Sequence, residues 1–304
     1  MKKNSTEKSN AEASACAKLI LLGEHSVVYG YPAIAVPLPS LRLHVRLKWA
    51  DRDLVKASVE PEDTGKIVQS LNVARKFLNY NKHMEIEINS GFPMKARLGS
   101  SAALNVAIVK ALADMECASL STERISSIAY EMEKIFHGTP SGIDTTVSAY
   151  EKPIYFIKGK PPEFIKIKKP LSIIIANTGI SASTKEVVAE VRSRREAEPG
   201  KYDAIFSKIG EISRKGRECI EEGNIDELGR LMSQNQQLLK EIGVSSPEID
   251  RLVDVSMKNG SLGAKLTGAG KGGCIAALAS PEDAGRIAEA LKRHSMEAFV
   301  AGIQ

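Results

Sequence analysis

The alternation of apolar and polar residues along the first half of the chain predicts a sheet. Between residues 41 and 49, LRLHVRLKW, large apolar side chains alternate with arginine, histidine and lysine. This period of two is typical of a strand that buries one face. Residues 84–88, MEIEI, alternate in the same way, with Glu85 and Glu87 on the polar side. We therefore predict that the basic and acidic faces pair across neighbouring strands.

Other apolar runs predict the remaining elements of this half. Short runs predict strands at 17–22, 33–38 and 153–158. A stretch rich in Ala, Leu and Val predicts a helix at 100–115, and another helix is predicted at 122–136 with Ser121 as its N-cap.

The second half reads as helices with a small sheet. Apolar residues recur every three or four positions between 205 and 242, interrupted by Gly223-Asn224, which predicts two amphipathic helices. Ser280-Pro-Glu-Asp283 is a helix start, with a Ser cap, Pro at the first position and acids in the first turn. The other predicted elements are a helix at 184–196 and strands at 172–176, 264–266, 274–279 and 297–301.

Length and composition allow one large domain or two medium ones, because the chain has 304 residues and 43% of them are apolar. The change from a strand-rich first half to helices with a small sheet favours an α+β chain of two domains. We place the boundary in the Lys- and Pro-rich stretch at 159–170. The expected organisation is a polar, frayed tail at 1–14, an N-terminal domain at 15–165 and a C-terminal domain at 166–304.

Charge and cysteine content argue against several classes of protein. The net charge of +5 is spread along the chain, and no aromatic platform accompanies the basic strand, so we expect no nucleic-acid partner. The four cysteines form no CxxC pair and predict buried or half-buried thiols, not disulfides or a zinc site. No run approaches the roughly 18 apolar residues of a membrane span, and residues 1–14 lack the apolar run of a signal peptide. We expect no membrane partner and a cytoplasmic location.

The first stretch that can carry chemistry is Gly99-Ser-Ser-Ala-Ala103, at the start of a predicted helix and after Lys95 and Arg97. A helix start has unbonded N–H groups and a partial positive charge, and small residues let a phosphate approach them. Ser100 and Ser101 add hydroxyls that can bond phosphate oxygens or Mg²⁺. The alternative is that the segment only caps a tightly packed helix.

The second stretch surrounds Glu133, which lies on the apolar face of the helix at 122–136. A carboxylate there needs a cation, a metal or several hydrogen-bond donors. Asp144 follows in a glycine-containing turn and is a candidate N-cap for the residues after it. Glu133 and Asp144 could hold a metal and accept a substrate proton, respectively, whereas an internal salt bridge is the alternative for Glu133. We interpret His137 as a structural hydrogen-bonder.

The third stretch is the glycine-rich turn LTGAGKGGC at 266–274, which contains Lys271. Such a turn can close over phosphates, or it can be a tight hairpin.

Together, these segments resemble the three motifs of the GHMP small-molecule kinases, and within that superfamily the mevalonate kinases. The segment KLILLGEHSVVYGYPAIAV at 18–36 resembles the first motif, and EKIFHGTPSGIDTTVSAY at 133–150 resembles the acidic motif, whose HGTPSGID stretch is the most specific piece. The order and spacing of GEH, GSSAA and the glycine-rich turn match, and the resemblance runs from Ala15 through nearly the whole chain.

The resemblance implies a ribosomal protein S5-like N-terminal domain and a ferredoxin-like C-terminal domain. It implies ATP-dependent phosphorylation of the 5-hydroxyl of mevalonate, with ATP and mevalonate in a cleft between the domains, and we expect a homodimer. The implied catalytic pair is Asp144 with Lys18. The implied Mg²⁺ ligands are Ser101 and Glu133. The residues implied around mevalonate are Glu24, His25 and Thr184. The residues implied around the triphosphate are Gly99, Ser100 and Ser101, bordered by Lys95 and Arg97.

The sequence departs from the family pattern at a few positions. Cys16-Ala17 replaces Pro-Gly before Lys18, and Lys95, Arg97 and Lys271 stand where glycines are usual. Lysine disfavours positive φ, so we expect the backbone of the C-terminal turn to take a different path. The added cations could strengthen phosphate binding, hold a second phosphate or point into solvent.

The departures leave room for a phosphorylated acceptor, as in phosphomevalonate kinase. A catalytically silent binding module is an alternative from a different class, and the intact Lys18, Glu133 and Asp144 argue against it. The mevalonate diphosphate decarboxylases share the aspartate but not the combination of Lys18 with Glu133.

Overall fold

The computed structural model describes residues 8–57, 61–92 and 98–304, which divide into two compact units. Unit 1 holds the described parts of 1–17, 39–94 and 99–151, and unit 2 holds those of 18–38, 95–98 and 152–304. The units interleave along the sequence because β1 (Asn10–Leu22) and β2 (Ala33–Trp49) each run from one unit into the other.

Unit 1 contains a sheet whose polar face is paired as predicted. Its further strands are β3 (Leu54–Lys56) and β4 (Met84–Ser90). In the antiparallel register of β2 and β4, Arg46 lies opposite Glu87 and Lys48 opposite Glu85. The Lys48 ammonium lies 2.6 Å from a Glu85 oxygen, and an Arg46 nitrogen lies 3.7 Å from a Glu87 oxygen. The basic face of residues 41–49 is therefore neutralised by its neighbours in the sheet.

Strand β1 begins earlier than the polar composition of the N-terminus predicts. Residues 10–14, which we assigned to the frayed tail, belong to β1, and Ala11 is buried. Strand β2 supplies the polar partners of this segment, because Arg46 pairs with Glu12 and Arg42 Nε donates to Ser14 Oγ at 3.0 Å. Pairing with a neighbouring strand thus orders a segment that has few apolar residues of its own.

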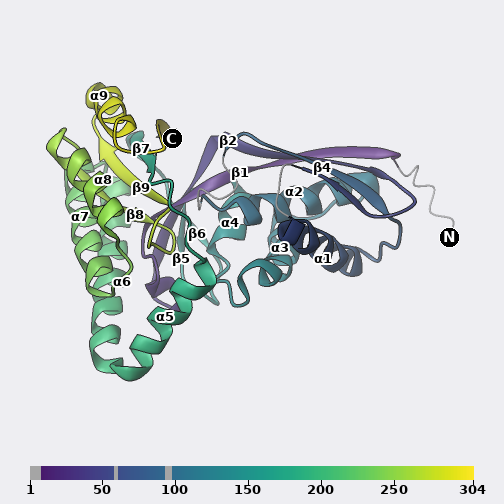
Figure 1. The fold of residues 1–304 in the computed structure, drawn as a ribbon, viewed down its shortest axis with the longest axis horizontal. Helices are drawn as coiled ribbons and strands as arrows, with labels where there is room; N and C mark the ends of the chain where they lie inside the picture. The colour runs from purple at the N-terminus through teal and green to yellow at the C-terminus, as the bar shows by residue number, and fades with distance from the viewer. Residues whose placement is uncertain (1–7, 58–60, 93–97) are drawn as a thin grey trace. The chain divides into compact units, whose positions relative to one another are not determined.

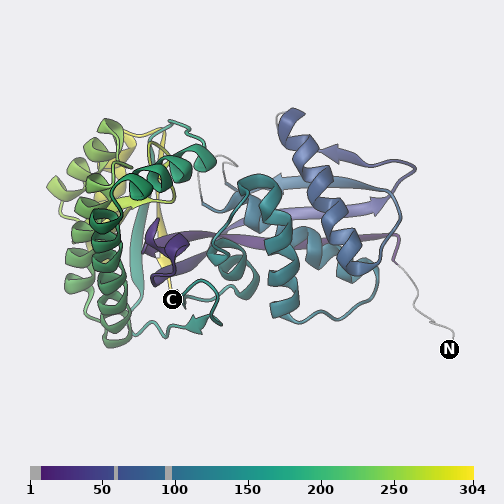
Figure 2. The same ribbon diagram turned by 90° about the horizontal axis from the view of Figure 1, so that it is seen from below.

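The helices of unit 1 lie on one side of its strands (Figures 1 and 2). They are α1 (Pro61–Leu78), α2 (Ser100–Met115), α3 (Thr122–His137) and α4 (Ile143–Tyr150). Helix α2 has its predicted bounds and is buried on nearly every side, as expected for a helix that is apolar all round. The predicted cap of α3 is confirmed, since Ser121 Oγ accepts from the Arg124 N–H at 3.2 Å.

Unit 2 contains a four-stranded antiparallel sheet. Its strands are β7 (Leu171–Asn177), β8 (Gly263–Thr267), β9 (Cys274–Ala279) and β10 (Glu297–Ile303), in the order β10-β7-β9-β8. Helices follow β7 and β9, so the chain reads βαββαβ. This order and connectivity define the ferredoxin-like arrangement that we predicted.

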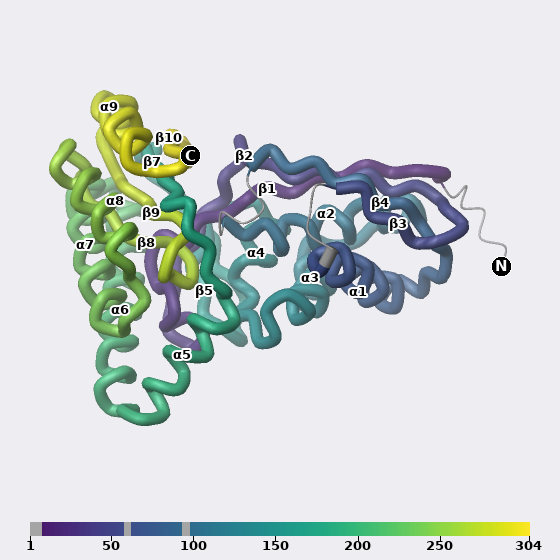
Figure 3. The backbone as a smooth tube through the Cα atoms, in the orientation of Figure 1, coloured from purple at the N-terminus to yellow at the C-terminus, as the bar shows by residue number. Residues whose placement is uncertain are grey.

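Helices cover one face of this sheet. They are α5 (Thr184–Ala197), α6 (Pro199–Glu222), α7 (Ile225–Glu241), α8 (Pro247–Lys258) and α9 (Pro281–Lys292). Figure 3 traces α6 and α7 as long neighbouring helices. Ile174, Leu266 and Ile275 of the sheet share a buried cluster with Phe206, Leu239 and Ile287 of the helices. This face of the sheet therefore forms the core of unit 2.

Short elements complete unit 2. They are the 3-10 helix η1 (Ser26–Tyr29) and strands β5 (Ile154–Phe156) and β6 (Glu163–Phe164). Residues 33–35 of β2 pair with β5. None of the helices in the described ranges is long and apolar enough to cross a bilayer. Cys16, Cys219 and Cys274 are buried as predicted, whereas Cys117 is exposed because it sits in the turn after α2.

Candidate active site

A buried carboxylate in unit 1 is bound by side chains from the start of α2. Glu133 of α3 is 2% exposed. Ser101 Oγ donates to its Oε1 at 2.6 Å, and Asn105 Nδ2 donates to its Oε2 at 2.7 Å. His137 Nε2 lies 3.2 Å from both Ser101 Oγ and Glu133 Oε1. Glu133 thus has the several polar partners that its burial requires, and His137 bonds within the same cluster.

The same cluster stands at the N-terminus of α2. Gly99 is the N-cap, Ser100 is the first helical residue and Ser101 is the second. Ser100 and Ser101 are half-buried. The first N–H groups of a helix have no acceptor within it. The first turn of α2 therefore offers backbone donors and the Ser101 hydroxyl beside the Glu133 carboxylate of α3. Lys95 and Arg97, predicted to border this loop, lie outside the described residues.

Asp144 is the second residue of α4, not its cap. Gly142 is the N-cap, and Thr146 Oγ1 donates back to the Gly142 carbonyl at 2.8 Å. Ser148 Oγ donates to the Cys16 carbonyl at 3.1 Å, which ties α4 to β1 within unit 1. The half-buried Asp144 carboxylate therefore sits in the first turn of a short, anchored helix, where the helix dipole favours its charge.

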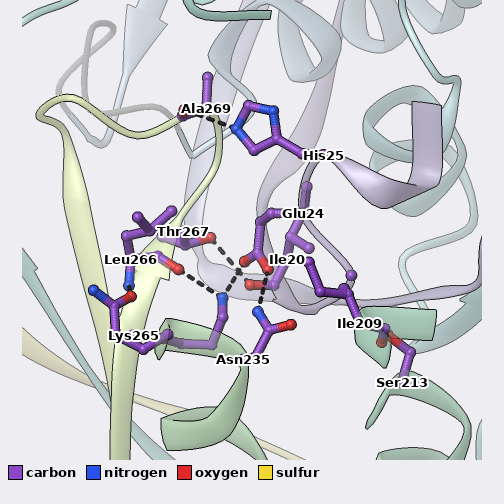
Figure 4. Close-up of polar contacts among 12 residues, drawn as sticks. Ile20, Glu24, His25, Ile209, Ser213, Asn235, Lys265, Leu266, Thr267 and Ala269 are labelled. Carbon is purple, nitrogen blue, oxygen red and sulfur yellow. Dashed lines mark hydrogen bonds and ion pairs between the residues drawn. The ribbon is translucent and has the colours of Figure 1, made fainter. Parts of the chain in front are cut away.

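In unit 2, the turn after β1 is built around Gly23, Glu24 and His25. Gly23 has a φ of 98°, and a Cβ there would lie 2.5 Å from the Ala33 Cα, so only glycine fits. Glu24 is 1% exposed and forms an ion pair with Lys265 of β8, whose side chain is fully buried. Asn235 Nδ2 of α7 donates to the second Glu24 oxygen at 3.2 Å (Figure 4). Both Glu24 oxygens are thus bound inside unit 2.

Burial dominates the electrostatics of this pair. It raises the pKa of Glu24 and lowers the pKa of Lys265, and their mutual attraction opposes both changes. Lys265 Nζ also donates to the Leu266 carbonyl at 2.6 Å. The pair therefore supports the turn after β1 from inside unit 2. Removing either partner would leave a buried, unpaired charge, which destabilises the folded state.

His25 connects this support to the glycine-rich turn. His25 Nε2 lies 2.9 Å from the carbonyl oxygen of Ala269, as Figure 4 shows. A carbonyl only accepts, so Nε2 carries the proton in this contact. The two residues predicted to contact mevalonate therefore have different surroundings. Glu24 is paired with Lys265 in the interior of unit 2, and His25 lies between Glu24 and the glycine-rich turn.

Lys18 and Thr184 also belong to unit 2. Lys18 lies in β1, is 2% exposed and donates its backbone N–H to the Leu98 carbonyl at 2.9 Å. Thr184 is the half-buried first residue of α5, directly after the N-cap Ser183. The helix predicted at 184–196 is confirmed within one residue, so the position of Thr184 at a helix start was readable from sequence.

The glycine-rich turn has a positive φ at Lys271. Lys271 has a φ of 55°, in the left-handed region that glycine favours. Our expectation that lysine would abandon positive φ was wrong. Backbone bonds hold the turn on both sides, because the Lys271 N–H donates to Val244 O at 2.7 Å and the Gly273 N–H donates to Ile180 O at 2.8 Å.

Sequence reasoning missed Asn105, Asn235 and Lys265. Each is a polar residue at a buried position of an apolar pattern, in α2, α7 and β8 respectively. Such a break in the pattern was the available signal, since a buried polar group needs a partner. Its partner could not be read from the pattern.

The donor set in unit 1 fits a magnesium ion held mainly by phosphates. Hydroxyl and carboxylate oxygens such as those of Ser101 and Glu133 are ligands that Mg²⁺ prefers, usually beside waters and phosphate oxygens. Within the described ranges, no three His, Cys, Asp or Glu side chains are grouped so that they could hold a metal by themselves.

Comparison with known proteins identifies the class. The model for the GHMP kinases N terminal domain matches residues 66–152, and the model for GHMP kinases C terminal matches residues 217–296. The chain belongs to the GHMP kinase family.

Its similar proteins include mevalonate kinases. The mevalonate kinase of Thermococcus sibiricus is 36% identical over 310 residues, covering 92% of both chains. That of Pyrococcus horikoshii is 37% identical over 312 residues, covering 92% of this chain and 91% of its own. The crystal structure of L. major mevalonate kinase in complex with R-mevalonate aligns with a TM-score of 0.88 and 27% identity, covering 100% of this chain and 99% of that chain.

Proposed function

We propose that this chain is a mevalonate kinase, which transfers the γ-phosphoryl group of ATP to the 5-hydroxyl of mevalonate. The observation that carries the proposal is the cluster of Ser101, Asn105 and Glu133 at the start of α2. Its backbone N–H groups could bind an anion, and the oxygens of Ser101 and Glu133 could hold a phosphate-bound cation. The choice of mevalonate as acceptor follows the relatives, which match along almost their whole length.

The residues of unit 1 would bind the nucleotide and prepare the acceptor. Gly99, Ser100 and Ser101 would hold phosphate oxygens at the start of α2. Glu133 and Ser101 would hold Mg²⁺, which neutralises the phosphate charge that develops during transfer. Asp144 would accept the proton of the acceptor hydroxyl, a poor nucleophile at neutral pH.

The residues of unit 2 would orient the acceptor. Lys18 would act with Asp144 by stabilising negative charge on the reacting oxygen. His25 and Thr184 would contact mevalonate, while Glu24 would act through His25. In-line positioning contributes more to phosphoryl transfer than covalent participation of the protein does.

A coupled ADP-release assay with mevalonate, phosphomevalonate, galactose and homoserine tests the proposal. We expect turnover with mevalonate and a product whose phosphorus NMR places the phosphoryl group on the 5-oxygen. Turnover with phosphomevalonate alone would replace the proposal with the related kinase. Binding without turnover of any acceptor would favour a silent module.

The catalytic role of Asp144 is tested by Asp144→Ala. We expect kcat to fall by at least about 100-fold, the lower end for a general acid–base group, with an unchanged circular dichroism spectrum. The matched control is Asp114→Ala, because Asp114 lies near the far end of α2 and is 45% exposed. Wild-type turnover in Asp144→Ala, or an equal loss in the control, would contradict the role.

Assembly as a homodimer and a domain boundary near residue 165 stay predictions from the sequence.

A further inference from the structure

The glycine-rich turn carries a cation that is bound to a carboxylate of α5. Lys271 Nζ forms an ion pair with Glu190 Oε2, and the other Glu190 oxygen is paired with Arg194 one helical turn further on. Lys271 and Glu190 are 35% and 38% exposed. The Lys271 side chain therefore does not point freely into solvent, and its charge is paired with that of Glu190.

The same contacts connect three segments of unit 2. Arg194 Nη1 donates to the carbonyl of Ile242 at 2.9 Å, and the Lys271 N–H donates to the carbonyl of Val244 at 2.7 Å. Glu190 thus lies between two cations, each tied to the short connection after α7. We call Glu190, Arg194 and Lys271 the clasp.

The backbone of Lys271 shows why such a clasp is needed. A side chain at positive φ places its Cβ in a crowded position, and such a conformation persists only where surrounding contacts enforce it. The hydrogen bond from Lys271 is the largest cause that lowers the pKa of Glu190. Glu190 is therefore ionised throughout the neutral range, and the ion pair is present there.

We propose that Lys271 is a positioning residue, which fixes the glycine-rich turn through Glu190 and does not itself bind phosphate. The inference rests on the proposed function, and it takes the first of the two roles that the sequence leaves open for this turn, that of closing over the phosphates of ATP. It follows that Glu190, acting through Lys271, helps to set the affinity for ATP. If Lys271 bound phosphate directly, Glu190 would compete with the phosphate for the Lys271 ammonium and would weaken the binding of ATP.

The sign of the effect of Glu190→Gln separates these two roles. We expect Glu190→Gln and Lys271→Met each to raise the KM for ATP by about twofold to fivefold, the size expected of a part-exposed ion pair. The KM for the acceptor and kcat stay near wild type. The double variant is no worse than Glu190→Gln alone, because that substitution already removes the pair with Lys271 as well as the pair with Arg194. The matched control is Glu289→Gln, which removes a pair with Lys292 on α9 at 2.6 Å and leaves every constant unchanged.

Amide hydrogen exchange gives a readout that needs no catalysis. In both variants the amides of residues 268–273, including the Lys271 N–H, exchange about twofold to fivefold faster than in wild type. A lower or unchanged KM for ATP in Glu190→Gln, or unchanged exchange in both variants, overturns the clasp. Should the wild type phosphorylate none of the acceptors while the exchange still responds, the proposed function fails and the positioning of the turn by Glu190 stands.

Discussion

At the scale of single residues, Lys265 and Glu24 form an ion pair inside unit 2. Each side chain has no exposed surface, and burial shifts the pKa of each toward its neutral form. At neutral pH the folded state therefore penalises both charges relative to the unfolded chain. Such a pair specifies where the turn after β1 sits more than it stabilises the fold.

This balance predicts unequal effects of single and double substitution. Lys265→Met leaves the Glu24 carboxylate buried without its cation, and we expect a loss of about 3–5 kcal/mol in the free energy of unfolding. Glu24→Leu combined with Lys265→Met removes both charges and recovers most of that loss. Urea unfolding followed by circular dichroism measures both. A double variant as unstable as the single one would show that the pair itself stabilises the fold.

At the scale of elements, the two faces of β8 divide the work of unit 2. Ala264 and Leu266 belong to the apolar cluster beneath the helices. Lys265 and Thr267 face the other way, toward Glu24 and toward the Ile20 carbonyl at 3.1 Å. Because side chains alternate along β8, the Glu24–Lys265 pair next to His25 lies on the face of the strand opposite to the apolar cluster.

The close approach of α7 to β8 makes a specific prediction about Gly263. A Cβ at Gly263 would lie 1.8 Å from the carbonyl oxygen of Gly229, which is rigid helix backbone. We expect Gly263→Ala to lower the free energy of unfolding by about 1–3 kcal/mol, as overpacking does.

The control is Gly285→Ala in α9, where nothing lies within 4 Å of the added Cβ. That variant gains about 0.5–1 kcal/mol because alanine favours a helix over glycine. Equal thermal unfolding midpoints for the two variants would contradict the close packing.

At the scale of the whole molecule, sequence patterns predicted elements better than partners. The period of two in β2 and β4, the apolar run of α2 and the caps of α3 and α9 identified those elements, because these signals are local. Helix α1 was missed, since Gly65 and a mixture of charges blur its apolar face. The Glu133 cluster was foreseen as a need for partners, but Asn105 was not named. Lys265 and Glu24 are 241 residues apart, and no local pattern reports such a pairing.

The interleaving of the units sets a limit on how the chain can be divided. Residues 152–304 contain all of the ferredoxin-like sheet but lack residues 18–38 of the same unit. That missing segment supplies Glu24 to the buried Lys265 and the part of β2 that pairs with β5. A fragment of 152–304 would therefore bury an unpaired ammonium and leave a strand edge open.

We expect this fragment to remain unfolded when it is produced alone, with little dispersion in its amide NMR spectrum. Adding a peptide of residues 18–38 in excess should restore dispersed resonances. A peptide that binds only the folded state shifts the folding equilibrium toward that state. The same peptide with Glu24→Gln is the matched control: it keeps the strand but not the carboxylate, and it should restore folding less well. Cooperative folding of the fragment without any peptide would show that β1 and β2 are dispensable for unit 2, and the units would then be domains in the ordinary, separable sense.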